Sequence, residues 1–124
     1  MLRNLRVFSV LLLVLLGAGD ARAAAVVQAY VPRVAMPGDV IEIYGTGFGS
    51  YRQKHWMHLR YGRGNDMLGL IEPGRIMLWL PHVIRLRLPE DLTPGPYWIA
   101  LYDSLGKLVS NRTPALNIQR PGGR

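Results

Sequence analysis

The sequence contains no cysteine, so neither a disulfide bridge nor a lipid on an N-terminal cysteine can hold or anchor the protein. Acidic residues are also scarce, with 8 Asp and Glu against 15 Lys and Arg and a formal net charge of +7. A glycosidase needs two carboxylates that face each other across a cleft, and the few acids here fall mostly in expected turns. No serine stands in a nucleophile-elbow motif. We therefore expect a non-catalytic domain stabilised by packing alone.

Long apolar runs are missing beyond residues 7–16, which follow two arginines and precede Ala21-Arg22-Ala23. A basic start, a short apolar run and small residues at a cleavage site predict a secretory signal peptide over residues 1–23. The run is too short for a membrane-spanning helix, which needs about 20 residues. We expect an exported protein with no transmembrane segment in the mature chain, located in the periplasm, at the cell surface or outside the cell.

Removal of residues 1–23 lowers Lys and Arg from 15 to 12 and Asp and Glu from 8 to 7, which leaves a net charge of +5. Outside the cytoplasm, this charge favours envelope polysaccharides, lipid head groups or acidic proteins over nucleic acid. About a hundred residues suffice for one small core but not for a deep enclosed cleft. The sequence predicts a single domain over residues 24–119 and a disordered tail over residues 120–124.

Helical periodicity is absent after residue 23, and short alternating segments are separated by Gly and Pro turns. Such a pattern is typical of an all-β sandwich. The expected strands are 26–31, 40–44, 55–61, 67–71, 75–80, 82–88, 97–102, 107–109 and 115–119. Residues 62–66 and 72–74 are expected to be a loop and a turn.

A glycine cluster at residues 45–49 ends the second of these strands, after a Pro37-Gly38 turn. The cluster does not match a dinucleotide fingerprint, because Ser50 stands where a third glycine is needed. It also lacks the Gly-Lys-Ser/Thr of a phosphate-binding loop. We interpret it as a corner whose glycines let Phe48 fold back onto the core.

Four motifs in this order resemble an IPT/TIG domain, the immunoglobulin-like fold found in plexins, some transcription factors and many bacterial surface proteins. They are Pro37-Gly38-Asp39 with the strand and corner up to Gly49, Trp79 with the strand ending at Pro89, Pro94-Gly95 with Tyr97, and Ser110-Asn111 before the last strand. The resemblance implies structural roles for Gly45, Gly47, Phe48, Gly49, Trp79, Gly95 and Tyr97. It implies binding of proteins or polymers and supplies no catalytic residues. Leu80-Pro81-His82 departs from the polar turn that the family often has there.

Five residues are candidates for ligand binding. If Tyr97 and its alternate neighbours face the core, Trp98 and Tyr102 must face outward. By the same alternation, strand 55–61 sends Trp56, His58 and Arg60 outward, and the two strands are neighbours in an immunoglobulin-like sandwich. The resulting aromatic and basic band suits stacking on sugar rings or anchoring a protein partner. The alternative is that residues 63–74 or the tail cover the rings and form a second small core.

Two other functions remain open from the sequence. A small periplasmic copper carrier would use histidine with Met57 and Met77, although His55 and His58 are three apart and so point to opposite sides of a strand. A structural subunit of a surface assembly would pair its free sheet edges with a neighbour. We expect no cofactor.

Overall fold

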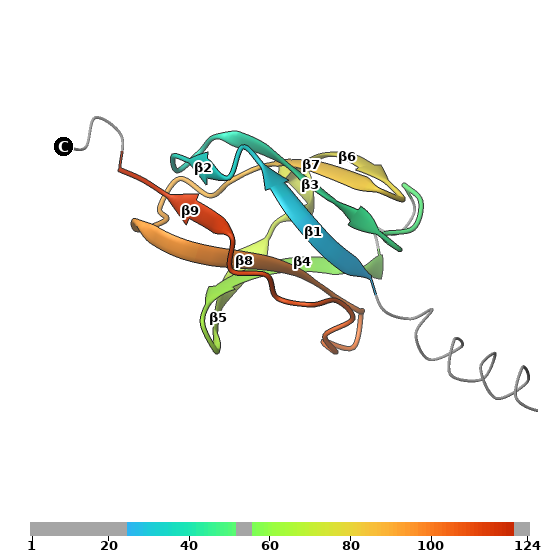
Figure 1. Ribbon diagram of the computed structural model, residues 1–124. Coiled ribbons are helices and arrows are strands. Elements are labelled where there is room, and N and C mark those ends of the chain that lie inside the picture. Colours follow the sequence, from blue (N-terminus) through green and yellow to red (C-terminus); the bar gives the residue numbers. More distant parts are fainter. Residues whose placement is uncertain (1–24, 52–55, 121–124) are drawn as a thin grey trace, which may run out of the picture.

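Two β-sheets packed face to face build the structure (Figure 1), a computed structural model that describes residues 25–51 and 56–120. The protein is therefore all-β, as predicted. The strands are β1 (Val26–Val31), β2 (Val34–Ala35), β3 (Val40–Thr46), β4 (His58–Arg63), β5 (Asp66–Ile71), β6 (Ile76–Leu80), β7 (Val83–Arg87), β8 (Gly95–Tyr102) and β9 (Leu116–Ile118). One 3₁₀ turn, η1 (Pro73–Arg75), lies where the turn at residues 72–74 is expected.

The strand order is β1-β3-β7-β6 in the four-stranded sheet and β2-β9-β8-β4-β5 in the five-stranded sheet. All pairs are antiparallel except the short β2–β9 pair, which is parallel. The described strands change sheet five times along the chain, and two of these connections run through η1, between β5 and β6, and through the link between β7 and β8. β4 and β8 are neighbours, as predicted.

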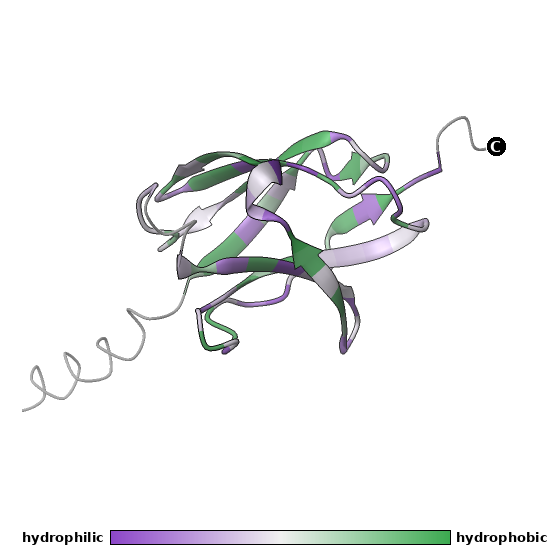
Figure 2. Ribbon diagram, turned by 180° about the vertical axis from the view of Figure 1, so that it is seen from behind, coloured by the Kyte–Doolittle hydropathy of each residue, from purple (hydrophilic) through white to green (hydrophobic). Residues whose placement is uncertain are grey.

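The core lies between the sheets and is built by strand alternation. Ile84, Leu86 and Leu88 face it with almost no exposure, while the arginines between them face solvent. Figure 2 shows the same alternation of hydrophobic and hydrophilic positions along the strands. The largest buried side chains on this side are Tyr30, Phe48, Trp79 and Tyr97.

The glycine corner packs as predicted. Phe48 is fully buried, and the Trp79 indole Nε1–H donates to its carbonyl oxygen at 2.7 Å. Gly47 and Gly49 take φ values of 76° and 81°, which other residues rarely adopt. A Cβ on Gly45 would lie 2.7 Å from Cζ of Phe48, so this glycine leaves space for the ring. The corner is structural.

Three stretches differ from the predictions. Residues 62–66 are not a loop, because β4 and β5 continue through them and meet at a two-residue turn, Gly64–Asn65. Residues 107–109 form only an isolated bridge between Tyr102 and Leu108 instead of a strand. The expected strand at 55–61 begins only at His58, and His55 lies outside the described residues.

The described chain enters and leaves the sandwich at opposite ends, with the start of β1 and the end of β9 far apart (Figure 1). The expected signal peptide and residues 121–124 lie outside the described residues. No helix in the described ranges is long and apolar enough to cross a membrane.

Candidate functional site

The outer face of the five-stranded sheet, turned away from the core, carries the predicted binding residues of β4 and β8. The register places His58 opposite Tyr102, Arg60 opposite Ala100 and Gly62 opposite Trp98. The sequence prediction that these side chains share one face is confirmed. We call the surface formed by Arg60, Arg112 and His58 over the rings of Trp98 and Tyr102 the basic face.

The prediction that both β8 rings are exposed is wrong. Trp98 is 1% and Tyr102 9% exposed, and with Ala100 and the partly buried Leu108 they form a second small core. The alternative of covered rings therefore describes the structure. Trp56 is 54% exposed, but it precedes β4 and is not part of this cluster.

The β4–β5 hairpin and Arg112 together cover Trp98. A Cβ at position 62 would collide with the indole, so Gly62 allows the ring to lie across β4. The indole Nε1–H donates to the carbonyl oxygen of Gly64 at 2.9 Å. The Arg112 guanidinium carbon lies 5.2 Å from the ring centroid. The backbone of the β4–β5 hairpin and the Arg112 guanidinium thus occupy the space above the Trp98 ring that a ligand would need.

Tyr102 is covered by Arg60, whose guanidinium carbon lies 5.2 Å from the ring centroid. Such cation–π contacts attract a guanidinium to the face of a ring. Among the arginines of the described chain, only Arg75 and Arg85 form ion pairs with carboxylates. Nε of Arg60 is buried without a hydrogen-bond partner in the described structure. The basic face therefore presents positive charge that no described acid neutralises.

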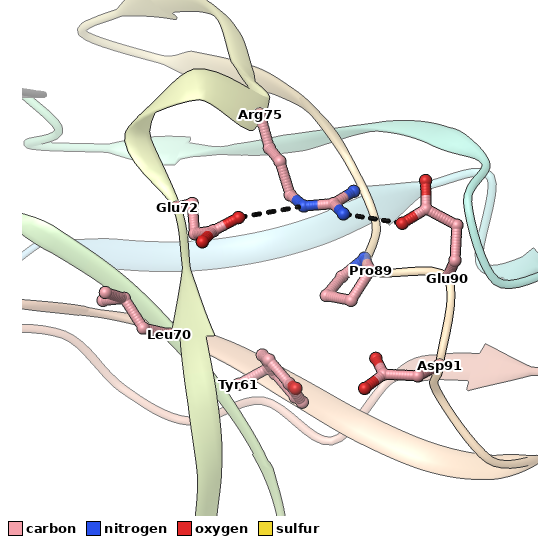
Figure 3. Close-up of a pocket in the computed structure, with 7 residues that line it drawn as sticks. All are labelled: Tyr61, Leu70, Glu72, Arg75, Pro89, Glu90 and Asp91. Carbon is pink, nitrogen blue, oxygen red and sulfur yellow. Dashed lines mark hydrogen bonds and ion pairs between the residues drawn. The ribbon is translucent and has the colours of Figure 1, made fainter.

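A pocket of about 350 Å³ opens beside β4, at the edge between the two sheets (Figure 3). It lies between the end of β5, η1 and the β7–β8 link. Its lining combines one aromatic ring, apolar side chains and charged groups: Tyr61, Leu70, Glu72, Arg75, Pro89, Glu90 and Asp91. None of these was predicted as a site residue.

Arg75 spans one side of this pocket and links the segment at Glu72 to the segment at Leu88 and Glu90. Its guanidinium donates to the carbonyl oxygen of Leu88 at 2.9 Å and to a carboxylate oxygen of Glu90 at 2.6 Å. Nε also lies 3.8 Å from the carboxylate of Glu72 (Figure 3). The hydrogen bond from Arg75 holds the pKa of Glu90 below its usual range. Glu72, Arg75 and Glu90 are therefore already paired with one another.

Asp91 differs from the other acids of the pocket, because its carboxylate makes no hydrogen bond or ion pair within the described chain. It lies near Tyr61, whose pKa is raised by burial and then by the negative charge of Asp91. The Tyr61 ring crosses β5 at Gly69, where a Cβ would lie 2.6 Å from the phenol oxygen. The pocket thus offers a free acceptor beside a fixed aromatic ring.

One sequence signal pointed to this part of the fold. Glycine inside a strand weakens it unless another group approaches closely, and here Gly62 and Gly69 each lie under an aromatic ring of the next strand. Which ring lies over which glycine depends on the register of the β4–β5 hairpin. The loop that the sequence predicts at residues 62–66 has no such register. The pocket depends on two of the connections between the sheets, through η1 and through the β7–β8 link, and has no local sequence signature.

The histidines and methionines proposed for copper are dispersed. His58 lies in β4 of one sheet, whereas His82 lies in the turn between β6 and β7 of the other. Met57 is partly buried against the main core, and Met77 is exposed on β6. In the described ranges no three His, Cys, Asp or Glu residues group as metal ligands.

No protein-family model and no curated protein sequence matches the chain. Solved structures do match. A structural-genomics protein of unknown function from Bacteroides thetaiotaomicron superposes with a TM-score of 0.59 at 14% identity, over 77% of this chain and 22% of that one. An auxiliary nutrient binding protein from Bacteroides ovatus gives 0.52 at 12% identity, over 77% and 21%.

A third similar structure is the gamma-CGTase of the alkalophilic Bacillus clarkii, with a TM-score of 0.52 and 26% identity. The match covers 78% of this chain and 12% of the enzyme. The chain thus spans about a fifth or less of the length of these proteins. The likenesses to the two Bacteroides proteins show the fold. This chain corresponds to one part of each of these longer proteins.

Proposed function

We propose that the protein is an exported, non-catalytic module that binds a polysaccharide, with the pocket beside β4 as the place where one sugar unit is held. The observation that carries this proposal is the combination in one pocket of an aromatic ring, apolar side chains and the unpaired carboxylate of Asp91. A sugar ring offers C–H groups to Tyr61 and Leu70 and hydroxyl donors to Asp91.

Two sequence predictions and the likeness to solved structures support the proposal. The immunoglobulin-like IPT/TIG type inferred from the sequence motifs is a fold used for binding, and one structural neighbour is named as a nutrient binding protein. A small part of a gamma-CGTase is similar to this chain, and we take that likeness as support for carbohydrate binding and not for catalysis. The signal peptide predicted for residues 1–23 agrees with this proposal, since polysaccharides occur outside the cytoplasm.

The test is isothermal titration of the mature protein with a panel of soluble neutral and acidic polysaccharides and their oligosaccharides. We expect Asp91→Asn to weaken binding about tenfold, because a hydrogen bond to a charged acceptor is lost. Asp66→Asn makes the same chemical change at the exposed start of β5 and serves as the matched control.

Neither side chain makes a hydrogen bond or ion pair within the described chain, so both variants should keep the melting temperature of the wild type. Equal affinities for Asp91→Asn and Asp66→Asn would remove the pocket from the proposal. No binding to any polysaccharide of the panel would remove the function itself.

A further inference from the structure

The basic face is separate from the pocket and carries arginines that form no ion pair within the described chain. Arg60 and Tyr61 are consecutive on β4, so the first side chain faces outward while the second turns toward the pocket. We infer that the basic face binds the acidic groups of a polysaccharide, so that the polymer recognised by this module carries carboxylate or sulfate groups. This inference rests on the proposed function and adds the chemical class of the ligand.

The charge on this face is uncompensated. Arg60 lies against Tyr102 and Arg112 against Trp98, and neither arginine forms an ion pair within the described chain. Asp103, the residue after Tyr102, accepts hydrogen bonds from the backbone N–H groups of Leu105 and Lys107 at 2.9 and 2.8 Å. An incoming anion therefore meets two guanidinium groups without displacing a protein carboxylate.

The two cations are spaced for a polymer and not for one small anion. Trp98 and Tyr102 are four residues apart on β8, which corresponds to about 13 Å along a strand. Each guanidinium is held over one ring, so the pair marks two points along the strand direction. A linear polysaccharide with acidic groups at intervals reaches both points, and His58 lies beside one of them, opposite Tyr102 on the neighbouring strand.

Arginine favours carboxylate and sulfate over other ligands on this face. The planar guanidinium matches two oxygens of such groups at once, and stacking on an aromatic ring fixes its orientation beforehand. The rings of Trp98 and Tyr102 are themselves buried, so neither is free to insert into a lipid interface. We therefore assign a soluble polymer, and an anionic membrane is an outcome that the test must separate.

The experiment compares two double variants of the mature protein that lose the same charge. Arg60→Gln with Arg112→Gln changes the basic face, whereas Arg33→Gln with Arg87→Gln changes exposed positions outside it. Binding is measured by interferometry on polygalacturonate, dextran sulfate and neutral dextran, at low and at high salt. Phosphatidylglycerol vesicles are the fourth probe. Circular dichroism and melting curves check that every variant folds.

We expect the first variant to lose about tenfold in affinity for polygalacturonate or dextran sulfate, and the control variant to stay within about twofold. Arg60→Lys with Arg112→Lys keeps the charge but loses the planar guanidinium that binds two oxygens of one acidic group. This variant should also bind more weakly than the wild type. This variant keeps the inference testable if the glutamine variant does not fold.

Three results would overturn the inference. Equal losses in the two glutamine variants would mean that only net charge matters. Binding to vesicles but to no acidic polysaccharide would assign the face to a membrane. Binding of neutral polysaccharides through Asp91, with no preference for acidic ones, would reject the acidic ligand while the proposed function stands.

Discussion

The Tyr30 hydroxyl replaces a strand partner that β8 lacks. β9 pairs with β8 only along Gly95–Tyr97, so the backbone groups of Ile99 on that side have no ladder partner. The Ile99 N–H donates to the Tyr30 hydroxyl at 2.9 Å, and this hydroxyl lies 2.9 Å from the carbonyl oxygen of Thr113. One buried side chain thereby joins β1, β8 and the segment that leads into β9.

We predict that Tyr30→Phe lowers the free energy of unfolding by about 1–3 kcal/mol, because it leaves the buried Ile99 N–H without an acceptor. Urea unfolding followed by fluorescence measures the loss. Tyr44→Phe is the matched control, since its hydroxyl contacts only Glu42 at the surface and its removal should change stability by less than about 0.5 kcal/mol. Equal effects of the two substitutions would contradict the bridging role.

The same residue makes stability depend on alkaline pH. Burial raises the pKa of Tyr30 to about 12, whereas an exposed tyrosine ionises near pH 10. The unfolded chain therefore releases this proton first, so the contribution of Tyr30 is present below pH 10 and is lost between about pH 10 and 12. The melting temperature of Tyr30→Phe should fall less over this interval than that of the wild type.

At the scale of elements, the β4–β5 hairpin depends on glycines that accept aromatic rings from neighbouring strands. Gly62→Ala would place a Cβ against both the Trp98 ring and the carbonyl oxygen of Asp66. We predict a loss of about 1–3 kcal/mol in unfolding free energy, as in other overpacked sites. Gly74→Ala should be nearly neutral, because a Cβ there meets no atom within 4 Å.

Denaturant unfolding of both variants tests this prediction. The near-ultraviolet dichroism of the buried Trp98 should also change in Gly62→Ala and stay constant in Gly74→Ala. A stable Gly62→Ala variant with an unchanged spectrum would show that the hairpin does not need the close approach of the indole.

Local patterns predicted most of the elements, because strand alternation and Gly/Pro turns act over a few residues. Ile41, Ile43 and the corner at Phe48 could be placed in this way, and the structure confirms their burial. The burial of Trp98 could not, since it depends on Arg112 and on a hairpin from another part of the chain. Alternation gives the face of a sheet on which a side chain lies but not what covers that face.

At the scale of the whole molecule, Arg75 joins two of the connections that cross between the sheets. Its ion pair with Glu90 links η1 to the β7–β8 link, and the hydrogen bond lowers the pKa of Glu90. A lowered pKa in the folded state means that this contribution is present above about pH 4.3 and is lost as pH falls through the folded value.

We therefore predict that Glu90→Gln lowers the melting temperature near neutral pH and that the difference from the wild type shrinks at about pH 3. Thermal unfolding followed by circular dichroism at both pH values measures it. Glu72→Gln is the control with a smaller expected effect, because Glu72 lies 3.8 Å from Nε of Arg75 and makes no hydrogen bond to it. A difference that is independent of pH would exclude this ion pair as its cause.

The opposite positions of the two described chain ends have a consequence for the architecture of longer proteins. A chain that continued past both ends would enter the sandwich on one side and leave it on the other (Figure 1). Such a module adds length in series between its neighbours instead of branching from one of them. Copies of this fold in a row would then act as a spacer that holds their successive binding surfaces apart at regular intervals.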